Sequence, residues 1–219
     1  MLNDPVRDRG AFLNFAAVFE GGLMFAAFFV GWLVEVDPVQ FLEWSWQAFG
    51  IGILGTAPLL ALFALTRNMV FEPVQRVHKL LIDGFGPWLD QCSLLDLALL
   101  SLLAGVCEEI AFRGLLQPWI GQLTWWTGFL AANIIFGLVH MVTPTYAIIA
   151  FVIGCYLSGL LLLTPGQNLL SAITTHAVYD FFALLFVVRE FRERPPQPAE
   201  SEPIADDVAE PIADDVTEP

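Results

Sequence analysis

Six apolar stretches, each long enough or nearly long enough to cross a bilayer as a helix, alternate with short polar segments along the chain. A transmembrane helix needs about 20 predominantly apolar residues. The stretches cover residues 11–34, 48–66, 94–117, 125–143, 145–163 and 168–188. Short connections that contain Pro118, Pro144 and Pro165 separate the last four. The pattern therefore predicts an all-α, polytopic membrane helix bundle of about six transmembrane helices.

Residues 67–93 follow a different pattern, in which Arg67, Arg76, His78 and Lys79 alternate with apolar residues at helical spacing. This alternation predicts an amphipathic helix that lies on the membrane surface. We therefore divide the chain into two N-terminal transmembrane helices (1–66), the surface helix (67–93), a core of four transmembrane helices (94–188) and an acidic tail (189–219).

The composition agrees with a membrane protein and narrows the set of partners. Hydrophobic residues make up 57% of the 219 residues and charged residues only 15%, where a soluble domain has about a quarter. The formal net charge is −14, and the chain has no basic patch, so we expect no nucleic-acid partner. The lipid bilayer is the surrounding that this composition requires.

The basic residues predict the topology. With six spans and both termini in the cytoplasm, every lysine and arginine outside a transmembrane span falls on the cytoplasmic side, as the positive-inside rule requires. These residues are Arg7, Arg9, Arg67, Arg76, Lys79, Arg189, Arg192 and Arg194. Because eukaryotic targeting signals are lacking, we expect an integral protein of the bacterial inner membrane.

The acidic tail repeats the heptapeptide EPIADDV at 202–208 and 210–216. Proline and acids without aromatic residues are typical of a disordered segment. The tail is either an inert solvated extension or a docking segment for a membrane-protein partner, and the sequence leaves both readings open.

The sequence GVCEEIAFRGLL, residues 105–116, places Glu108, Glu109 and Arg113 inside an apolar stretch. Three such charges at a helix centre would cost about 8 to 10 kcal/mol in contact with lipid, whereas the apolar residues of this span return only about 4 to 7 kcal/mol. The three side chains must therefore face the protein interior or a hydrated cavity. Ionisable residues inside a membrane indicate a functional site by default.

Helical spacing distinguishes the two glutamates. Glu109 precedes Arg113 by four residues, the favourable order for an ion pair, while Glu108 lies about 100° around the helix and has no basic residue one turn away. Glu108 is thus the candidate general base. Its candidate partners are His140 and His176, and Asp180 follows His176 by four residues on the same helix face. These groups form either a buried structural network or a catalytic centre, and we favour the second.

Three motifs on successive spans resemble those of one family. EEIAFR fits Glu-Glu-x-x-x-Arg, FGLVH fits Phe-x-x-x-His, and HAVYD fits His-x-x-x-Asn/Asp. In this order they resemble the CPBP family of intramembrane proteases, which includes the type II CAAX prenyl endopeptidases and bacterial Abi-like relatives. The resemblance covers about residues 94–188, and it implies an endopeptidase that acts on a membrane-associated or lipidated peptide or protein.

The resemblance also implies a role for each motif residue. Glu108 would activate the hydrolytic water with the help of His140, and His176 and Asp180 would stabilise the oxyanion. The residues that hold the architecture of the site would be Glu109, Arg113 and Phe136. Prenyl endopeptidases carry asparagine where this chain has Asp180, so Asp180 is either protonated or orients His176.

Several alternatives remain open at this level. Glu108, Glu109, His140 and His176 are potential zinc ligands, although no His-Glu-x-x-His pair is present, so we expect no cofactor and keep zinc as the alternative. Cys107 has no support as a nucleophile beyond its position next to Glu108. A non-catalytic membrane scaffold or accessory subunit is the alternative function. On ideal spans Glu108 and His140 are offset by about 10 to 15 Å, which requires tilted helices or a shifted span boundary.

Overall fold

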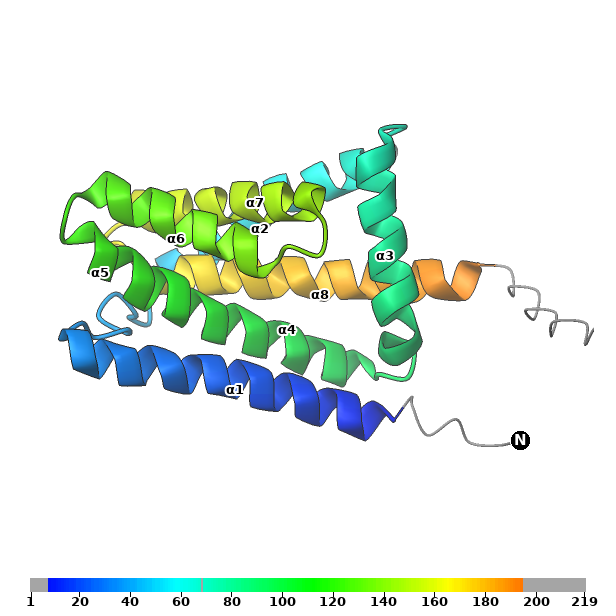
Figure 1. Cartoon of the computed structure of the whole chain (residues 1–219), viewed down its shortest axis with the longest axis horizontal. Coiled ribbons are helices and arrows are strands. Elements are labelled where there is room, and N and C mark those ends of the chain that lie inside the picture. The colour runs from blue at the N-terminus through cyan, green and yellow to red at the C-terminus, as the bar shows by residue number, and fades with distance from the viewer. Residues whose placement is uncertain (1–7, 68, 195–219) are drawn as a thin grey trace, which may run out of the picture.

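The computed structural model describes residues 8–67 and 69–194, and within these ranges every regular element is helical (Figure 1). The helices are α1 (Arg9–Val34), α2 (Trp46–Arg67), α3 (Glu72–Leu89), α4 (Leu94–Glu109), the π-helix η1 (Ile110–Leu116), α5 (Gln117–Gly121), α6 (Trp125–Val139), α7 (Pro144–Leu163) and α8 (Leu169–Glu193). The predicted all-α membrane bundle is confirmed. The repeat tail lies outside the described residues.

The number of clear spans is lower than the six predicted. Four helices, α1, α2, α7 and α8, are long and apolar enough to cross a membrane. The helix α6 is apolar but has only 15 residues, and the predicted span 94–117 is divided into α4, η1 and α5, which follow one another without a break. Six helical segments therefore form the bundle, but two of them do not meet the length and composition expected of a simple span.

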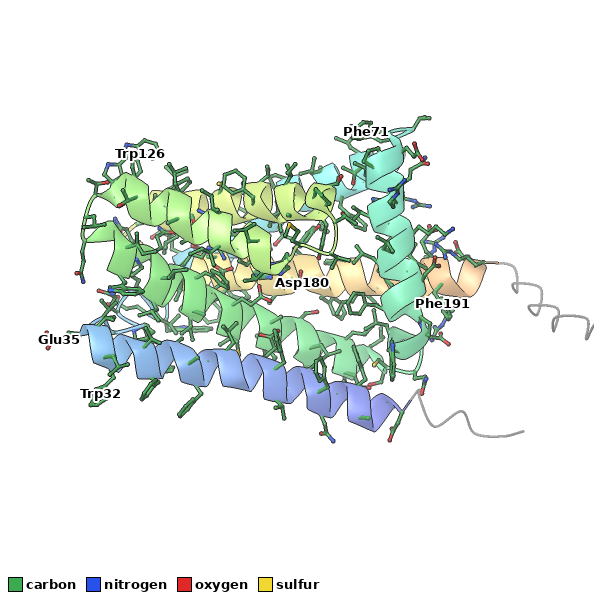
Figure 2. The ribbon with its side chains drawn as sticks, in the orientation of Figure 1. Trp32, Glu35, Phe71, Trp126, Asp180 and Phe191 are labelled. Carbon is green, nitrogen blue, oxygen red and sulfur yellow. The ribbon has the colours of Figure 1, made fainter. Side chains whose placement is uncertain are left out.

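The outer surface of the bundle is apolar. Val18, Trp32 and Leu54 are each about three-quarters exposed, which is the pattern of side chains that face lipid. Figure 2 shows Trp32 and Trp126 pointing outward near one end of the bundle, opposite the end that α3 crosses, where tryptophans of an interfacial belt are expected. The chain is an integral membrane protein.

The last helix, α8, runs through the middle of the bundle and packs against α2, α3, α4 and α7 (Figure 1). Gly105 allows α4 to approach it closely, because a Cβ atom there would lie 2.9 Å from the backbone nitrogen of Ala177. Small residues at helix crossings let membrane helices pack backbone to backbone. This crossing brings the C-terminal end of α4 next to the middle of α8.

The helix α3 crosses one end of the bundle steeply, near the described ends of α1 and α8 (Figure 1). Ion pairs gather at this end. They are Arg9 with Asp96, Arg67 with Glu190, Arg192 with Asp90 and Arg194 with Asp83. The arrangement agrees with an amphipathic surface helix, and the side of the membrane on which it lies stays a prediction.

Candidate active site

The motif glutamates lie where α4 changes into the π-helix η1, which carries the residues Ile110–Leu116. A π-helix is rare and is frequently found at functional sites. The predicted span 94–117 was a regular α-helix, so the π-helix is a difference from the prediction. Glu109 and Arg113 are fully buried, as the insertion argument requires, and the Arg113 Nη1 donates to the Glu109 Oε1 over 2.8 Å. The predicted ion pair is present.

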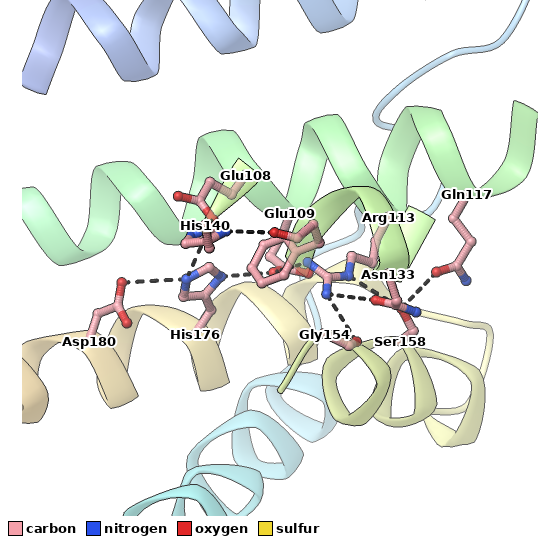
Figure 3. Close-up of polar contacts among 11 residues, drawn as sticks. Glu108, Glu109, Arg113, Gln117, Asn133, His140, Gly154, Ser158, His176 and Asp180 are labelled. Carbon is pink, nitrogen blue, oxygen red and sulfur yellow. Dashed lines mark hydrogen bonds and ion pairs between the residues drawn. The ribbon is translucent and has the colours of Figure 1, made fainter. Parts of the chain in front are cut away.

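Arg113 connects three helices through its guanidinium group (Figure 3). The Nη2 atom donates to Asn133 Oδ1 over 3.1 Å and to the carbonyl of Gly154 over 3.0 Å, and the Nε donates to Ser158 Oγ over 3.3 Å. The ring of Phe136 lies 4.5 Å from the guanidinium carbon, within cation–π range. A buried charge is tolerated only when it is paired and hydrogen-bonded, and Arg113 meets both conditions.

His176 joins the ion pair to the cavity. Its Nδ1 lies 2.8 Å from Glu109 Oε1, so this ring nitrogen donates to the carboxylate. Its Nε2 lies 3.9 Å from Glu108 Oε2 and 3.4 Å from Asp180 Oδ2. Glu109 therefore holds His176 as well as Arg113, and this second contact sets the orientation of the imidazole. The predicted face shared by His176 and Asp180 is present in the structure.

His140 ends the short helix α6 and turns toward Glu108. Its Nδ1 lies 2.8 Å from the carbonyl of Phe136 and donates to it, which leaves the Nε2 of a neutral ring as an acceptor. That Nε2 lies 3.7 Å from Glu108 Oε2. The offset of 10 to 15 Å predicted for ideal spans is therefore absent, and α6 ends at Val139 rather than at residue 143.

Glu108 differs from its neighbour in its hydrogen bonding. Its Oε2 is buried and has no hydrogen-bond partner among residues 8–67 and 69–194, and it faces both imidazole Nε2 atoms (Figure 3). Both distances are longer than a direct hydrogen bond. Polar groups at such distances can interact through a water molecule. The sequence-based distinction between a paired Glu109 and an unpaired Glu108 matches this geometry.

A cavity of about 380 Å³ opens beside these groups. Its polar lining includes Glu108, His140, His176 and Asp180, and its remaining walls are mainly apolar residues of α1, α2, α3, α4, α7 and α8. Figure 2 places Asp180 in the interior of the bundle, between the helix ribbons. Ligand pockets of this size combine apolar walls with a few convergent polar groups. The four predicted catalytic residues thus converge on one cavity.

The zinc alternative depends on whether these donors form a metal site. Within residues 8–67 and 69–194, no group of three or more histidine, cysteine, aspartate or glutamate side chains has the arrangement that holds a metal ion. Glu109 in addition points away from Glu108, toward Arg113 and His176. Glu109 is therefore occupied by protein partners, and the metal dependence of the site stays a prediction.

Sequence reasoning missed two sets of residues around the site. The first is the polar set behind Arg113, which consists of Gln117, Asn133, Gly154 and Ser158. Asn133 and Ser158 were detectable as isolated polar residues within apolar stretches. The second set lines the cavity and includes Glu20, Tyr146 and Tyr179. Glu20 was detectable as the single acid within the apolar stretch of residues 11–34.

The fold and the buried polar centre define a polytopic integral membrane protein built around an internal ionisable site. A family model described as "Type II CAAX prenyl endopeptidase Rce1-like" matches residues 90–182, which contain Glu108, His140, His176 and Asp180. Searches of the curated proteins and of the solved structures each found no match. Over residues 90–182 the chain is thus similar to the Rce1-like CAAX proteases, and this match confirms the resemblance to the CPBP family that the three motifs carry.

Proposed function

We propose that the chain is an intramembrane endopeptidase that hydrolyses a peptide bond in a membrane-associated or lipidated peptide or protein, with Glu108 as the general base. The observation that carries the proposal is the unpaired carboxylate oxygen of Glu108, which is buried in the cavity and faces His140 and His176. A positioned base within reach of a water molecule is what hydrolysis without a covalent intermediate requires.

The proposed reaction begins with a water molecule between Glu108 and His140. Glu108 takes one proton from the water, and the resulting hydroxide attacks the carbonyl carbon of the substrate. The Nε2 of a neutral His140, fixed as an acceptor by the bond from its Nδ1 to the Phe136 carbonyl, accepts the other hydrogen of the water as a hydrogen bond and so orients it.

The tetrahedral intermediate carries its negative charge on the former carbonyl oxygen. His176 would donate to this oxyanion from Nε2 while its Nδ1 donates to Glu109. Donation from both nitrogens requires that His176 is the imidazolium cation. Its positive charge is stabilised by two carboxylates, that of Glu109 near Nδ1 and that of Asp180 near Nε2. Collapse of the intermediate breaks the C–N bond, and Glu108 passes its proton to the leaving amine. The carboxylate is then regenerated.

The test compares Glu108→Gln with the unchanged protein in nanodiscs on two fluorescence-quenched probes, a farnesylated CAAX peptide and an apolar membrane-spanning peptide. We expect the variant to lose cleavage by about 10²- to 10⁴-fold, the range for removal of a general base. Glu35→Gln, which removes an exposed charge at the end of α1, is the matched control and should keep full activity. A Glu108→Gln protein that cleaves at the normal rate would contradict the proposal and favour the scaffold alternative.

We propose further that no metal ion takes part. Incubation with 1,10-phenanthroline should leave the rate of cleavage unchanged, and addition of Zn²⁺ afterwards should not raise it. Loss of activity with the chelator, followed by recovery with Zn²⁺, would instead support the metalloprotease reading.

A further inference from the structure

Glu20 is a buried acid of the cavity that the proposed reaction does not use. It lies on α1, before the segment that matches the protease family, and it lines the same cavity as Glu108. The residue is only 9% exposed, and its Oε2 has no hydrogen-bond partner. An unpaired carboxylate in apolar surroundings is costly, so a residue of this kind inside a membrane bundle indicates a function.

The register of α1 against α4 brings Glu20 to the level of Glu108. Arg9 donates from Nε and Nη2 to the carboxylate of Asp96, which fixes the first turns of the two helices side by side. Glu20 follows Arg9 by eleven residues, and Glu108 follows Asp96 by twelve. At 1.5 Å per residue these are rises of about 16 and 18 Å from the same ion pair. Because α1 and α4 pack together along their length (Figure 1), the two acids lie at nearly the same depth.

The charges that line the cavity are unbalanced. Its described lining contains three acids, Glu20, Glu108 and Asp180, and no lysine or arginine. Asp180 has His176 as its partner, and Glu108 faces both histidines. Arg113 is fully buried behind them and is occupied by Glu109 and the polar set of α6 and α7. Among residues 8–67 and 69–194, Glu20 alone of the three acids has no basic side chain within 4 Å, and His176 acts on it only through its longer-range charge.

We propose that Glu20 is a specificity-determining residue, and that it binds the lysine or arginine side chain of a substrate beside the peptide bond that is cut. This inference rests on the proposed function, since it assigns a substrate feature to the same cavity. A basic side chain has an apolar stem and a cationic head, which suits a cavity with mainly apolar walls and one carboxylate without an ion-pair partner. The substrate class is therefore an apolar peptide with one basic residue near the scissile bond.

The experiment uses a defined library of synthetic apolar peptides, each with and without a farnesylated cysteine. At every position the peptides carry lysine, norleucine or glutamate in turn, so that lysine and norleucine differ only in the ammonium group. The full-length protein and its Glu20→Gln, Glu35→Gln and Glu108→Gln variants digest the library in nanodiscs. Cleavage products are quantified by mass spectrometry as kcat/KM for each peptide.

For the unchanged protein we expect a preference for lysine over norleucine at one position near the cut, on the order of 30-fold, the effect of one buried charge pair. The Glu20→Gln variant should lose this preference and cleave the norleucine peptides at the original rate, because glutamine keeps the shape and the hydrogen bonding but not the charge. Glu35→Gln should keep the preference.

Equal preferences in the unchanged protein and in Glu20→Gln would overturn the proposal. A uniform loss of cleavage over all peptides in Glu20→Gln would overturn it too, because that result assigns Glu20 to the reaction or to the fold. Persistent cleavage by Glu108→Gln would instead refute the proposed function, so the two failures are distinguishable. Absence of any cleavage by the unchanged protein would reject both proposals.

Discussion

Glu108 and Glu109 are neighbours in the chain with opposite surroundings. The completely buried carboxylate of Glu109 receives hydrogen bonds from Arg113 and His176 on its Oε1, whereas the carboxylate of Glu108 receives none from the described residues and lines the cavity. The Oε2 of each glutamate is buried without a hydrogen-bond partner among the described residues. A step of about 100° around the helix thus separates Glu109, the acid of the buried ion pair, from Glu108, the acid that we propose as the general base. The same substitution at the two positions should therefore have different consequences for stability.

Replacing Glu109 by glutamine should destabilise the protein strongly. The change leaves Arg113 as a buried cation without its counter-ion, which typically costs about 3 to 5 kcal/mol. For a chain of this size that cost corresponds to a fall of the thermal unfolding midpoint on the order of 10 °C. Glu108→Gln is the matched control and should leave the midpoint nearly unchanged, because Glu108 has no ionic partner within hydrogen-bond distance. Similar midpoints for the two variants would show that the pair of Glu109 and Arg113 does not hold the fold.

Asp180 stands where prenyl endopeptidases carry an asparagine, and its Oδ2 lies 3.4 Å from His176 Nε2. Asparagine has the same shape and can accept from or donate to the same region, so Asp180→Asn should keep cleavage within about tenfold of the original rate. Asp180→Leu removes the polar group and should lower kcat by about 10²-fold, the loss expected for one group that stabilises the oxyanion. Both rates are measured on the farnesylated probe. A loss in Asp180→Asn as large as that in Asp180→Leu would show that a negative charge at this position is required.

At the scale of helices, contacts between two residues of the same helix could be predicted from the sequence. The pairs Glu109 with Arg113 and His176 with Asp180 follow from four-residue spacing, which fixes side chains on one face. The contacts of Arg113 with Asn133 and Ser158 join different helices, and no local pattern encodes which helices meet. The same holds for the depth of His140, which depends on where α6 ends.

The helix α7 approaches Arg113 through Gly154, and this close approach is testable. A Cβ atom at position 154 would lie 2.7 Å from Asn133 Oδ1 and 3.1 Å from Arg113 Nη2. Gly154→Ala should therefore destabilise the protein by about 1 to 3 kcal/mol and lower cleavage as well. Gly159→Ala on the same helix meets no atom within 4 Å and should be neutral or stabilising, by at most about 1 kcal/mol. Thermal unfolding of both variants gives the comparison, and equal effects would contradict the assigned packing.

The helix α3 packs onto the bundle through His78, whose ring lies 5.5 Å from that of Phe63 and 6.4 Å from that of Phe186. Burial lowers the pKa of His78 below 6.5; the charge of Glu190 opposes this shift in part, and that of Arg67 adds to it. Because the folded pKa lies below the unfolded value, the contribution of His78 is intact above about pH 6.5 and is lost as the pH falls toward the folded pKa.

Replacement of His78 by glutamine should reduce the loss of stability between pH 7.5 and pH 5.5. The measurement is the difference between the unfolding midpoints at the two pH values, compared with the unchanged protein. Lys79→Gln on the same helix is the control and should leave that difference as it is, because lysine stays charged across this range. An unchanged pH dependence in His78→Gln would show that the ring accepts a proton in the folded protein as easily as in the unfolded one.

At the scale of the whole molecule, the two helices before the family-matched segment belong to the same packed unit as the segment itself. The Tyr156 hydroxyl donates to the carbonyl of Gly55 over 2.7 Å, and the Thr175 hydroxyl donates to that of Gly52 over 2.9 Å. The α1 helix adds the ion pair of Arg9 with Asp96. The two N-terminal helices and the four-helix core of residues 94–188 are thus separate segments of the sequence but not separate units of the structure. Residues of both segments line the cavity.

A split protein tests this unity, because membrane helices that insert independently can associate afterwards. Expressed alone, residues 69–219 should be inactive, since α1 and α2 supply part of the cavity wall and the hydrogen-bond acceptors for Tyr156 and Thr175. Co-expression with residues 1–68 should restore cleavage of the probe, and the same pair of fragments with Glu108→Gln should stay inactive. Full activity of residues 69–219 alone would mean that the matched segment forms a complete enzyme, and that the first two helices serve a purpose other than closing the site.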